Sequence, residues 1–469
     1  MAAGMRVPGT TRRWGYACGA VIAAALLACA AGCTAFPTKT QQVWRSLTDH
    51  DYPSEPVGSP GFEAALDRYT GSAALPVSDP LLLQNGDEAY PAMLALIGGA
   101  RRSISLETYI IESDATTDTF FAALKDAAAR GVRVRVLVDA AGFHRGLVAH
   151  LDELSSSGVE ARVFNPFFLS WTIVRGNNRD HRKILVADGE HAVLGGINLS
   201  DEQTGDGVSG WRDTALKISG PGAAEAERVF NQTWLQGGRG WVGKSLPVAS
   251  LNPVKKALDA PFMPDGEDDG CIEAAAPCSP DRARADGMPS VRVVASAPDM
   301  ANSPLYDLAI LGVSGARERI DVACAYFVPP LGLRRALLAA AGRGVSVRLL
   351  LPGVTDVRMV REMGMRFYGQ LLDAGVEIYE WPHPILHAKT MVVDGRWLVV
   401  GSANMDSRSY FLNYEASLVL SDPSVAGQAH AQFERDMESA HRVTREEWRA
   451  RGVRQRFLEK ALIPLAGQY

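Results

Sequence analysis

The stretch that decides the fold is HRKILVAD, residues 181–188. Its four apolar residues predict a buried strand. Because side chains of an extended chain alternate between its two faces, His181 and Lys183 point to the same side and could meet one ligand. Asp188 and the glycine after it form a dipeptide typical of a hairpin turn. The stretch therefore predicts a strand that presents two polar groups at one end and turns sharply at the other.

The same pattern occurs a second time as HAKTMVVD, residues 387–394. In both copies six residues separate the aspartate from a glycine, and an asparagine follows, which is Asn198 in the first copy and Asn404 in the second. One such motif could arise by chance. Two copies in matching surroundings indicate chemistry rather than structure alone.

The sequence around the two motifs is duplicated as well. GARRSI at residues 99–104 corresponds to GARERI at residues 315–320, and each leads into a strand-like segment. Helical stretches and further strands follow in the same order in both halves, with GVE at residues 158–160 matching GVE at residues 375–377. Strands that alternate with helices of this length predict an α/β fold with a mixed, mainly parallel sheet in each half.

Length and composition divide the chain into several parts. Its 469 residues are too many for one ordinary core. We expect a first lobe at residues 81–250 and a second lobe at residues 290–469. Residues 251–289 are rich in Pro, Gly, Asp and Ala and suit a linker. Residues 34–80 are typical of a tether with limited structure.

Residues 1–33 have the composition of an export signal. Arg12 and Arg13 precede a short apolar, alanine-rich run that ends at Cys33. The run resembles a lipobox, in which the cysteine becomes a lipid-modified N-terminus. Cys29 is a competing position, and an uncleaved signal anchor is a further alternative. The segment predicts an exported bacterial lipoprotein, associated with the membrane through Cys33 and facing the periplasm.

Charge and cysteine spacing exclude some classes of protein. The formal net charge of -5 gives no bulk electrostatic reason to bind polyanions, so a nucleic-acid partner is not expected. No His/Cys spacing suggests zinc, and we expect neither a metal nor a cofactor. Cys324 lies in an apolar stretch that favours a buried free thiol. Cys271 and Cys278 are close enough to form a local disulfide in an exported chain, and the sequence leaves open whether they pair.

The paired motifs contain what attack on a phosphodiester requires. Such a reaction needs a nucleophile, a proton donor for the leaving alkoxide, and cationic donors for the non-bridging oxygens. Two histidines, His181 and His387, can divide the first two roles. Lys183 and Lys389 can supply the third. The near-symmetry of the halves leaves open which histidine attacks.

The duplicated pattern H-x-K-x4-D-x6-G-[GS]-x-N resembles the signature of the phospholipase D superfamily. The surrounding sequence is similar to the bacterial cardiolipin synthase branch of that superfamily. The stretches that carry this second likeness are NRDHRK at residues 178–183, GVEIYE at 375–380, LHAK at 386–389 and GSANMDSRS at 401–409. The resemblance covers residues 80 to 469. It implies two similar α/β/α sandwich lobes packed as a pseudo-dimer, with the active site between them.

The resemblance also implies roles for the site residues. His181 would form a phosphohistidine, and His387 would act as general acid and base. Each histidine needs an orienting acceptor, because the hydrogen bond on one ring nitrogen fixes which nitrogen faces the phosphorus. Glu107 could enter the site but is left out, because its counterpart Ala323 is not acidic. The predicted residues are, as catalytic groups, His181, Lys183, Asp188, His387, Lys389 and Asp394; as substrate-binding groups, Asn198, Asn404 and Ser402; and as histidine-orienting carboxylates, Asp213 and Glu415.

For Asp188 and Asp394 a turn role is an equal alternative, because each precedes a glycine at the predicted hairpin. A turn residue would hold the loop rather than carry a proton.

The activity implied by the resemblance is phosphatidyl transfer, as in making cardiolipin from two phosphatidylglycerols. The partners would be phospholipid substrates and a membrane surface, and the protein would act as a monomer. Hydrolysis through the same intermediate, as in a phospholipase D or a nuclease, is the nearest alternative. A membrane-tethered lipid-binding scaffold is the non-enzymatic alternative, although two intact motifs argue against it. The sequence leaves the acceptor alcohol open.

Overall fold

The computed structural model of this chain describes residues 52–142, 147–165, 178–235, 245–247, 289–298, 300 and 302–452. The chain divides into Met1–Asp51 and a compact unit, Tyr52–Tyr469, which contains all of these residues. The predicted export signal with Cys33 and Cys29, most of the predicted linker, and both Cys271 and Cys278 lie outside them. None of the helices in the described ranges is long and apolar enough to cross a membrane.

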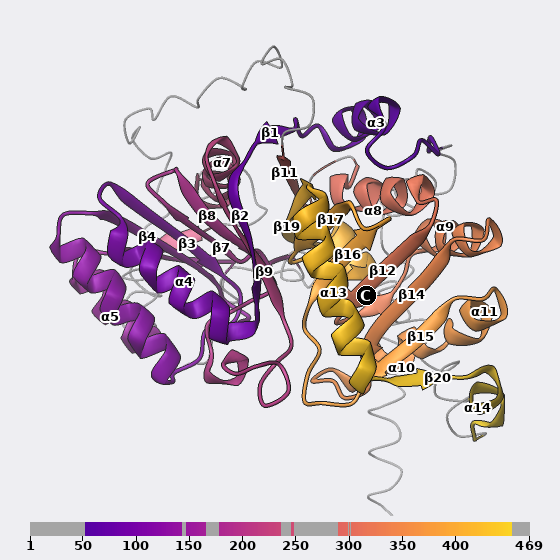
Figure 1. The fold of residues 1–469 in the computed structure, drawn as a ribbon. Helices are drawn as coiled ribbons and strands as arrows, with labels where there is room; N and C mark the ends of the chain where they lie inside the picture. Colours follow the sequence, from indigo (N-terminus) through magenta and orange to yellow (C-terminus); the bar gives the residue numbers. More distant parts are fainter. Residues whose placement is uncertain are drawn as a thin grey trace, which may run out of the picture. The chain divides into compact units, whose positions relative to one another are not determined.

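The first lobe is built on an eight-stranded sheet (Figure 1). From one edge to the other the strands run β10, β5, β4, β3, β7, β8, β9, β2. The strands are β2 (Ser78–Gln84), β3 (Ser103–Thr108), β4 (Arg133–Asp139), β5 (Glu160–Phe164), β7 (Ile184–Ala187), β8 (His191–Gly195), β9 (Thr214–Ser219) and β10 (Ser245–Pro247), and the helices are α4 (Asn85–Gly99), α5 (Ala115–Ala129), α6 (Leu147–Ser156) and α7 (Pro221–Leu235), with a short 3-10 helix at Asp201–Gln203.

The second lobe repeats this plan strand for strand. Its sheet runs β20, β15, β14, β12, β16, β17, β19, β11, with the short β1 beyond β11, and β6 pairs with β19 off this path. The strands are β1 (Leu75–Pro76), β6 (Arg179–Asp180), β11 (Ser290–Ser296), β12 (Arg319–Cys324), β14 (Ser346–Pro352), β15 (Glu377–Trp381), β16 (Lys389–Val393), β17 (Trp397–Gly401), β19 (Asn413–Ser421) and β20 (His441–Val443). Two further strands, β13 (Phe327–Val328) and β18 (Met405–Asp406), form a small sheet of their own.

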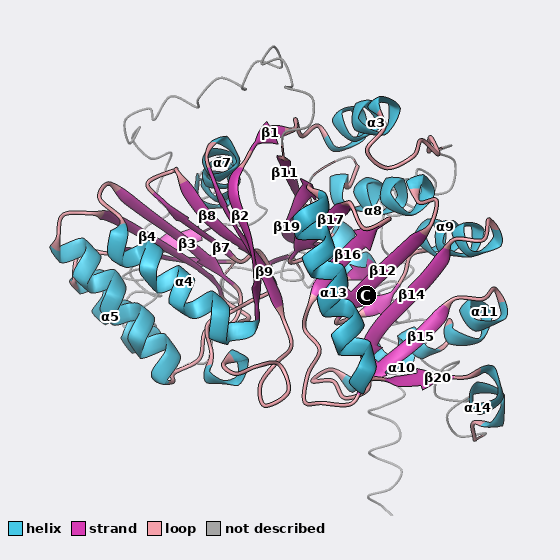
Figure 2. Cartoon of the chain, viewed as in Figure 1, coloured by secondary structure: helices cyan, strands magenta, loops and turns pink. Residues whose placement is uncertain are grey.

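Several helices cover the two sheets. Figure 2 shows α4 and α5 over the first sheet, and α8, α9 and α11 over the second. The helices of this lobe are α8 (Pro304–Gly315), α9 (Leu331–Gly342), α10 (Arg358–Met365), α11 (Tyr368–Asp373), α12 (Ser407–Phe411), α13 (Pro423–Ser439) and α14 (Arg445–Ala450). The α/β class and the duplicated plan expected from the repeated sequence are confirmed.

The strand directions differ from the expectation. Along the two sheet paths, parallel pairing occurs at β3–β4, β4–β5, β12–β14 and β14–β15. All other neighbouring strands on these paths are antiparallel. The prediction of mainly parallel sheets is therefore wrong. Asp188 and Asp394 have φ values of 57° and 50°, and the glycines after them also have positive φ. Only three residues separate the paired Ala187 and His191, and likewise Val393 and Trp397, so each turn returns the chain at once as an antiparallel neighbour, without a crossover helix.

The two lobes share one hydrophobic core. A single buried cluster contains Ile184 and Leu194 from the first sheet together with Leu398 and Val400 from the second. Helices α7 and α13 add alanines and valines from both lobes to the same cluster. Because burial of apolar surface is the main stabilising contribution to folding, this shared cluster holds the two motif-bearing sheets face to face.

Part of the predicted tether is folded. Residues 60–70 form α3 (Pro60–Thr70), which begins at Ser59, whose side chain accepts from Phe62 N, and ends at Gly71 with a φ of 64°. The Phe62 ring lies 5.6 Å from that of Trp397, and Glu63 forms an ion pair with Arg292 at 2.8 Å. The prediction of limited structure is wrong for the described residues 52–80, and α3 packs on the second lobe.

We expect Leu398→Ala to lower the free energy of unfolding by about 2–5 kcal/mol, because it leaves a cavity in the shared cluster. Leu81→Ala is the matched control, because Leu81 is 48% exposed and its truncation should change stability by less than about 0.5 kcal/mol. Denaturant unfolding of the full chain measures both. Equal effects of the two substitutions would contradict the shared core.

Candidate active site

Each motif is held by the backbone of the opposite lobe. β6, which leads into His181, pairs in parallel with the start of β19, and His181 N donates to Tyr414 O at 2.9 Å. In the same way Leu386 forms a bridge with Arg212, and His387 N donates to Arg212 O at 2.7 Å. These contacts place both histidines where the two lobes meet.

The two histidines are bound to carboxylates in a crossed arrangement. His181 Nδ1 lies 3.0 and 3.1 Å from the two oxygens of Glu415, which belongs to the second lobe. His387 Nδ1 lies 2.6 Å from Asp213 Oδ2, which belongs to the first lobe. A carboxylate only accepts, so each Nδ1 carries the hydrogen and each Nε2 keeps a free lone pair. The sequence suggested both carboxylates but not that they would cross between lobes.

The two lysines are buried beside the histidines. Lys183 Nζ donates to the carbonyl of His181 at 2.7 Å, and Lys389 donates to that of His387. Burial lowers the pKa of Lys183 to about 7, and the nearby charge of Lys389 lowers it further against the opposing pull of Glu415. Burial also lowers the pKa of Lys389. Charged groups of the second lobe therefore shift the pKa of a lysine in the first lobe, so both lysines lie in one site.

The histidines respond to the same surroundings. Burial lowers the pKa of His181 to about 4, with Glu415 opposing and Lys183 adding to the effect. Burial and Lys389 lower the pKa of His387. With no ligand present, both imidazoles are therefore neutral at pH 7, which is the form a nucleophile needs.

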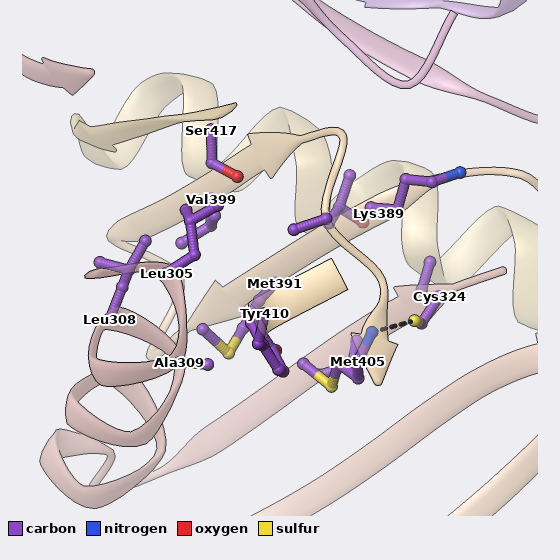
Figure 3. Close-up of a pocket in the computed structure, with 14 residues that line it drawn as sticks. Leu305, Leu308, Ala309, Cys324, Lys389, Met391, Val399, Met405, Tyr410 and Ser417 are labelled. Atoms are coloured by element: carbon purple, nitrogen blue, oxygen red, sulfur yellow. Dashed lines mark hydrogen bonds between the residues drawn. The ribbon is translucent and has the colours of Figure 1, made fainter. Parts of the chain in front are cut away.

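An apolar cavity lies behind Lys389 in the second lobe (Figure 3). It is walled by Leu305 and Leu308 of α8, among others. Figure 3 shows the ammonium end of Lys389 directed away from these leucines. Cys324, at the same wall, is a buried free thiol as expected, and its sulfur accepts from Met405 N at 3.3 Å. The apolar wall explains why burial lowers the lysine pKa.

The two motif asparagines are oriented by matching backbone contacts. Asn198 Oδ1 accepts from Ile110 N at 3.0 Å, and Asn404 Oδ1 accepts from Tyr326 N at 3.2 Å. The Nδ2 atom of Asn198 is buried and has no hydrogen-bond partner among the described residues. A buried amide nitrogen without an acceptor suits an anionic ligand that would supply one.

Ser402 supports a carboxylate instead of facing a ligand. Its hydroxyl lies 2.5 Å from Glu415 Oε2, accepts from Ala416 N at 3.0 Å, and is fully buried. The matching residue of the first lobe is Gly196, where a Cβ atom would lie 2.1 Å from Asp213 Oδ1. The prediction that Ser402 binds substrate is therefore corrected, because its hydroxyl is used in holding Glu415.

The motif aspartates lie at the far ends of β7 and β16 from the histidines. Asp188 accepts from the backbone N–H groups of residues 101–103 at 2.7 to 3.2 Å. Asp394 accepts from those of residues 317–319 at 2.8 to 2.9 Å. Their prediction as catalytic groups is corrected. They tie each hairpin turn to the start of the neighbouring strand, which agrees with the turn alternative.

Two aromatic side chains beside the histidines were missed from sequence. The Tyr109 ring lies 4.8 Å from that of His181, and Lys183 Nζ lies 5.2 Å from its centre. The Trp211 ring lies 5.1 Å from that of His387. The sequence did offer a signal for Trp211, because it lies two residues before Asp213, the predicted histidine-orienting carboxylate. The two rings limit how far each imidazole can turn.

A buried carboxyl pair, Glu107 and Asp180, lies behind the first motif only. Both side chains are fully buried, and Glu107 Oε2 and Asp180 Oδ2 have no hydrogen-bond donor among the described residues. Burial raises the pKa of both groups, and the nearby Glu107 carboxylate raises that of Asp180 further. The matching residues of the second lobe, Ala323 and Leu386, lie in an apolar cluster. The backs of the two half-sites thus differ in charge.

The two-lobed fold, with paired His and Lys side chains at the junction, defines a protein of the phospholipase D superfamily. A family model described as "Cardiolipin synthase, PLD-like domain" matches residues 93–234 and 312–437, which is more than half of the chain. The chain belongs to this family.

Curated relatives agree with this assignment. The chain is 32% identical over 393 residues to a cardiolipin synthase of Geobacillus kaustophilus, covering 83% of this chain and 72% of that protein. It is 29% identical over 396 residues to cardiolipin synthase 1 of Bacillus anthracis, covering 84% of this chain and 73% of that protein.

Solved structures agree on the fold. Phosphatidylserine synthase of Haemophilus influenzae superposes with a TM-score of 0.62 at 14% identity, covering 87% of this chain and 98% of that one. Polyphosphate kinase of Porphyromonas gingivalis gives a TM-score of 0.50 at 14% identity, covering 88% of this chain and 57% of that one. At such low identity the likeness concerns the fold alone.

We expect Asp188→Asn and Asp394→Asn to lower the free energy of unfolding by about 1–3 kcal/mol each, because neutral amides hold the three backbone N–H groups less strongly. Under conditions where the variants are folded, turnover of phospholipid should stay within a few-fold of the parent. Denaturant unfolding and a lipid assay measure the two effects. A loss of turnover comparable to that of a histidine variant, in a folded protein, would restore the catalytic assignment.

Proposed function

We propose that this protein is a phosphatidyltransferase that joins the phosphatidyl group of one phosphatidylglycerol to the head group of a second phospholipid. The observation that carries the proposal is the crossed pair of histidine–carboxylate contacts, His181 with Glu415 and His387 with Asp213, beside two buried lysines. It is supported by membership of the family and by relatives named cardiolipin synthase.

In the first step His181 Nε2 attacks the phosphorus, and the bond to the leaving glycerol oxygen breaks. His387, protonated once the anionic phosphodiester has bound, gives that oxygen its proton. The products are a phosphatidyl-histidine and free glycerol. Assigning the attack to His181 follows the family resemblance, since the crossed geometry would serve either order.

In the second step a hydroxyl of the acceptor lipid gives its proton to His387 and attacks the phosphorus. The phosphorus–nitrogen bond breaks, and His181 returns to its neutral form. With phosphatidylglycerol as acceptor, the product is cardiolipin. Lys183 and Lys389 would balance the negative charge on the non-bridging oxygens in both steps, and Asn198 Nδ2 would donate to one of them.

The proposal includes attachment to a membrane. The signal-like residues 1–33 with Cys33 as lipid anchor would hold an exported, monomeric enzyme at the surface that contains its substrates. We propose phospholipids as its partners, with no nucleic acid, metal or cofactor required.

The direct test incubates the purified full chain with phosphatidylglycerol and follows lipid products. We expect cardiolipin and glycerol in equal amounts. His181→Ala and His387→Ala should each lower the turnover of phosphatidylglycerol by about 10²–10⁴-fold. His191→Ala is the matched control, because His191 lies on β8 with its Nδ1 2.8 Å from Ser219 Oγ and should leave turnover unchanged.

The products separate the alternatives. Phosphatidic acid without cardiolipin would replace transfer with hydrolysis, and binding without any product would support the scaffold. Acid quenching followed by mass spectrometry of peptides identifies the histidine that carries the phosphatidyl group. Turnover that survives both histidine substitutions would exclude the mechanism.

The pH dependence of kcat/KM provides a further prediction. A lysine is charged below its pKa, so the pKa of about 7 for Lys183 predicts that kcat/KM is retained below pH 7 and falls as the pH rises through that value. Protonation of His181 near pH 4 predicts an acidic limb. Because arginine keeps its charge, Lys183→Arg or Lys389→Arg should move the alkaline limb to higher pH. If the alkaline limb stays at the same pH in both variants, a group other than these lysines controls it.

A further inference from the structure

Two arginines of the second lobe each have one buried guanidinium nitrogen with no hydrogen-bond acceptor among the described residues. Arg334 lies on α9 and Arg366 lies between α10 and α11. Their guanidinium carbons lie 4.4 and 4.6 Å from the centre of the Phe367 ring. The Nε atom of Arg334 and the Nη1 atom of Arg366 are buried and meet no acceptor. Both cations therefore converge on one aromatic side chain with donors to spare.

The positive charge at this place is not compensated. Burial lowers the pKa of Arg334, and the charges of Arg366 and Arg335 lower it further, with no carboxylate acting in the opposite direction. Elsewhere on the same lobe arginines are paired, as Arg348 is with Asp321 at 2.6 Å and Arg361 with Glu380 at 2.7 Å. Among the described residues no carboxylate forms an ion pair with Arg334 or Arg366, and in a chain with a formal net charge of -5 two such neighbouring arginines suggest an anion supplied from outside.

The cluster is connected to the phosphate side of the candidate active site. α9 follows β13, which pairs with β18, the strand directly after Asn404. α10 packs closely on β13, since a Cβ atom at Gly364 would lie 2.3 Å from Phe327 O.

We propose that Arg334 and Arg366 bind the phosphate group of an anionic phospholipid, outside the catalytic site, and hold the second lobe on the membrane surface. Guanidinium groups match phosphate oxygens with paired N–H donors, and the ring of Phe367 holds both groups in place. The negative surface potential of an anionic membrane also attracts arginines that lie close to it. The site does not depend on the transfer reaction.

The test compares binding of the full chain to vesicles of phosphatidylcholine and to vesicles of equal parts phosphatidylcholine and phosphatidylglycerol. The quantity measured by sedimentation is the ratio of the two partition coefficients, which removes the contribution of an N-terminal anchor. We expect Arg334→Ala with Arg366→Ala to lower this ratio by about fivefold for each arginine, the equivalent of ~1 kcal/mol per charge near an anionic surface.

The matched control is Arg442→Ala with Arg449→Ala, which removes two charges from the same lobe. These arginines are exposed and paired, with Glu377 at 3.2 Å and Asp373 at 3.1 Å, so their loss should change the ratio much less. Arg334→Lys with Arg366→Lys keeps the charge and should recover most of the binding if the alanine variant folds poorly. An equal fall in both alanine pairs, or no fall in the first, would overturn the proposal.

Two further arms separate the source of the phosphate and the role of catalysis. If inorganic phosphate raises the Tm of the parent but not of the Arg334→Ala, Arg366→Ala variant, and the vesicle ratio is unchanged, the site takes free phosphate and the lipid assignment is wrong. The same ratio measured in a His181→Ala background should equal that of the parent. The outcome is thus independent of whether the transfer reaction itself is confirmed.

Discussion

The arrangement depends on the crossed hydrogen bonds between each histidine and a carboxylate of the opposite lobe. A buried imidazole held by a carboxylate at 2.6 or 3.0 Å tolerates little relative movement of the two lobes. The shared apolar cluster between the sheets supplies the stability that keeps these contacts in register. Neither half contains a complete histidine–carboxylate unit, so the site exists only in the assembled pair.

The two half-sites share a backbone plan but differ in what stands behind it. Glu107 and Asp180 form a buried carboxyl pair behind the first motif, whereas Ala323 and Leu386 lie in an apolar cluster behind the second. Similarly, Ser402 holds Glu415 where Gly196 only makes room for Asp213. A duplicated fold thus provides two histidines with the same tautomer and different electrostatic surroundings, which a reaction with two distinct histidine roles can use.

Much of this could be predicted from sequence, because the repeated motif fixes strand, turn and side-chain direction locally. Lys183 and Lys389 follow from the period of a strand. Strand direction did not follow, because it depends on whether the chain returns by a hairpin or by a crossover helix. The crossed carboxylates depend on contacts between the lobes, for which spacing along the chain carries no signal. The contact of Ser402 with Glu415 forms inside the second lobe, where β17 pairs with β19, and it depends on the register of these two strands. The helix α3 was missed because only a short capping signal precedes it.

Burial of the site has one further consequence for the proposed reaction. Removal of water lowers the pKa of Lys183 to about 7 and that of His181 to about 4, so part of the cationic charge is lost when no anion is present. An arriving phosphodiester supplies negative charge between the two lysines and favours their protonated forms. The same anion favours the imidazolium that the leaving oxygen requires. Substrate binding and proton uptake are therefore linked, and the cationic site is assembled fully only around the group on which it acts.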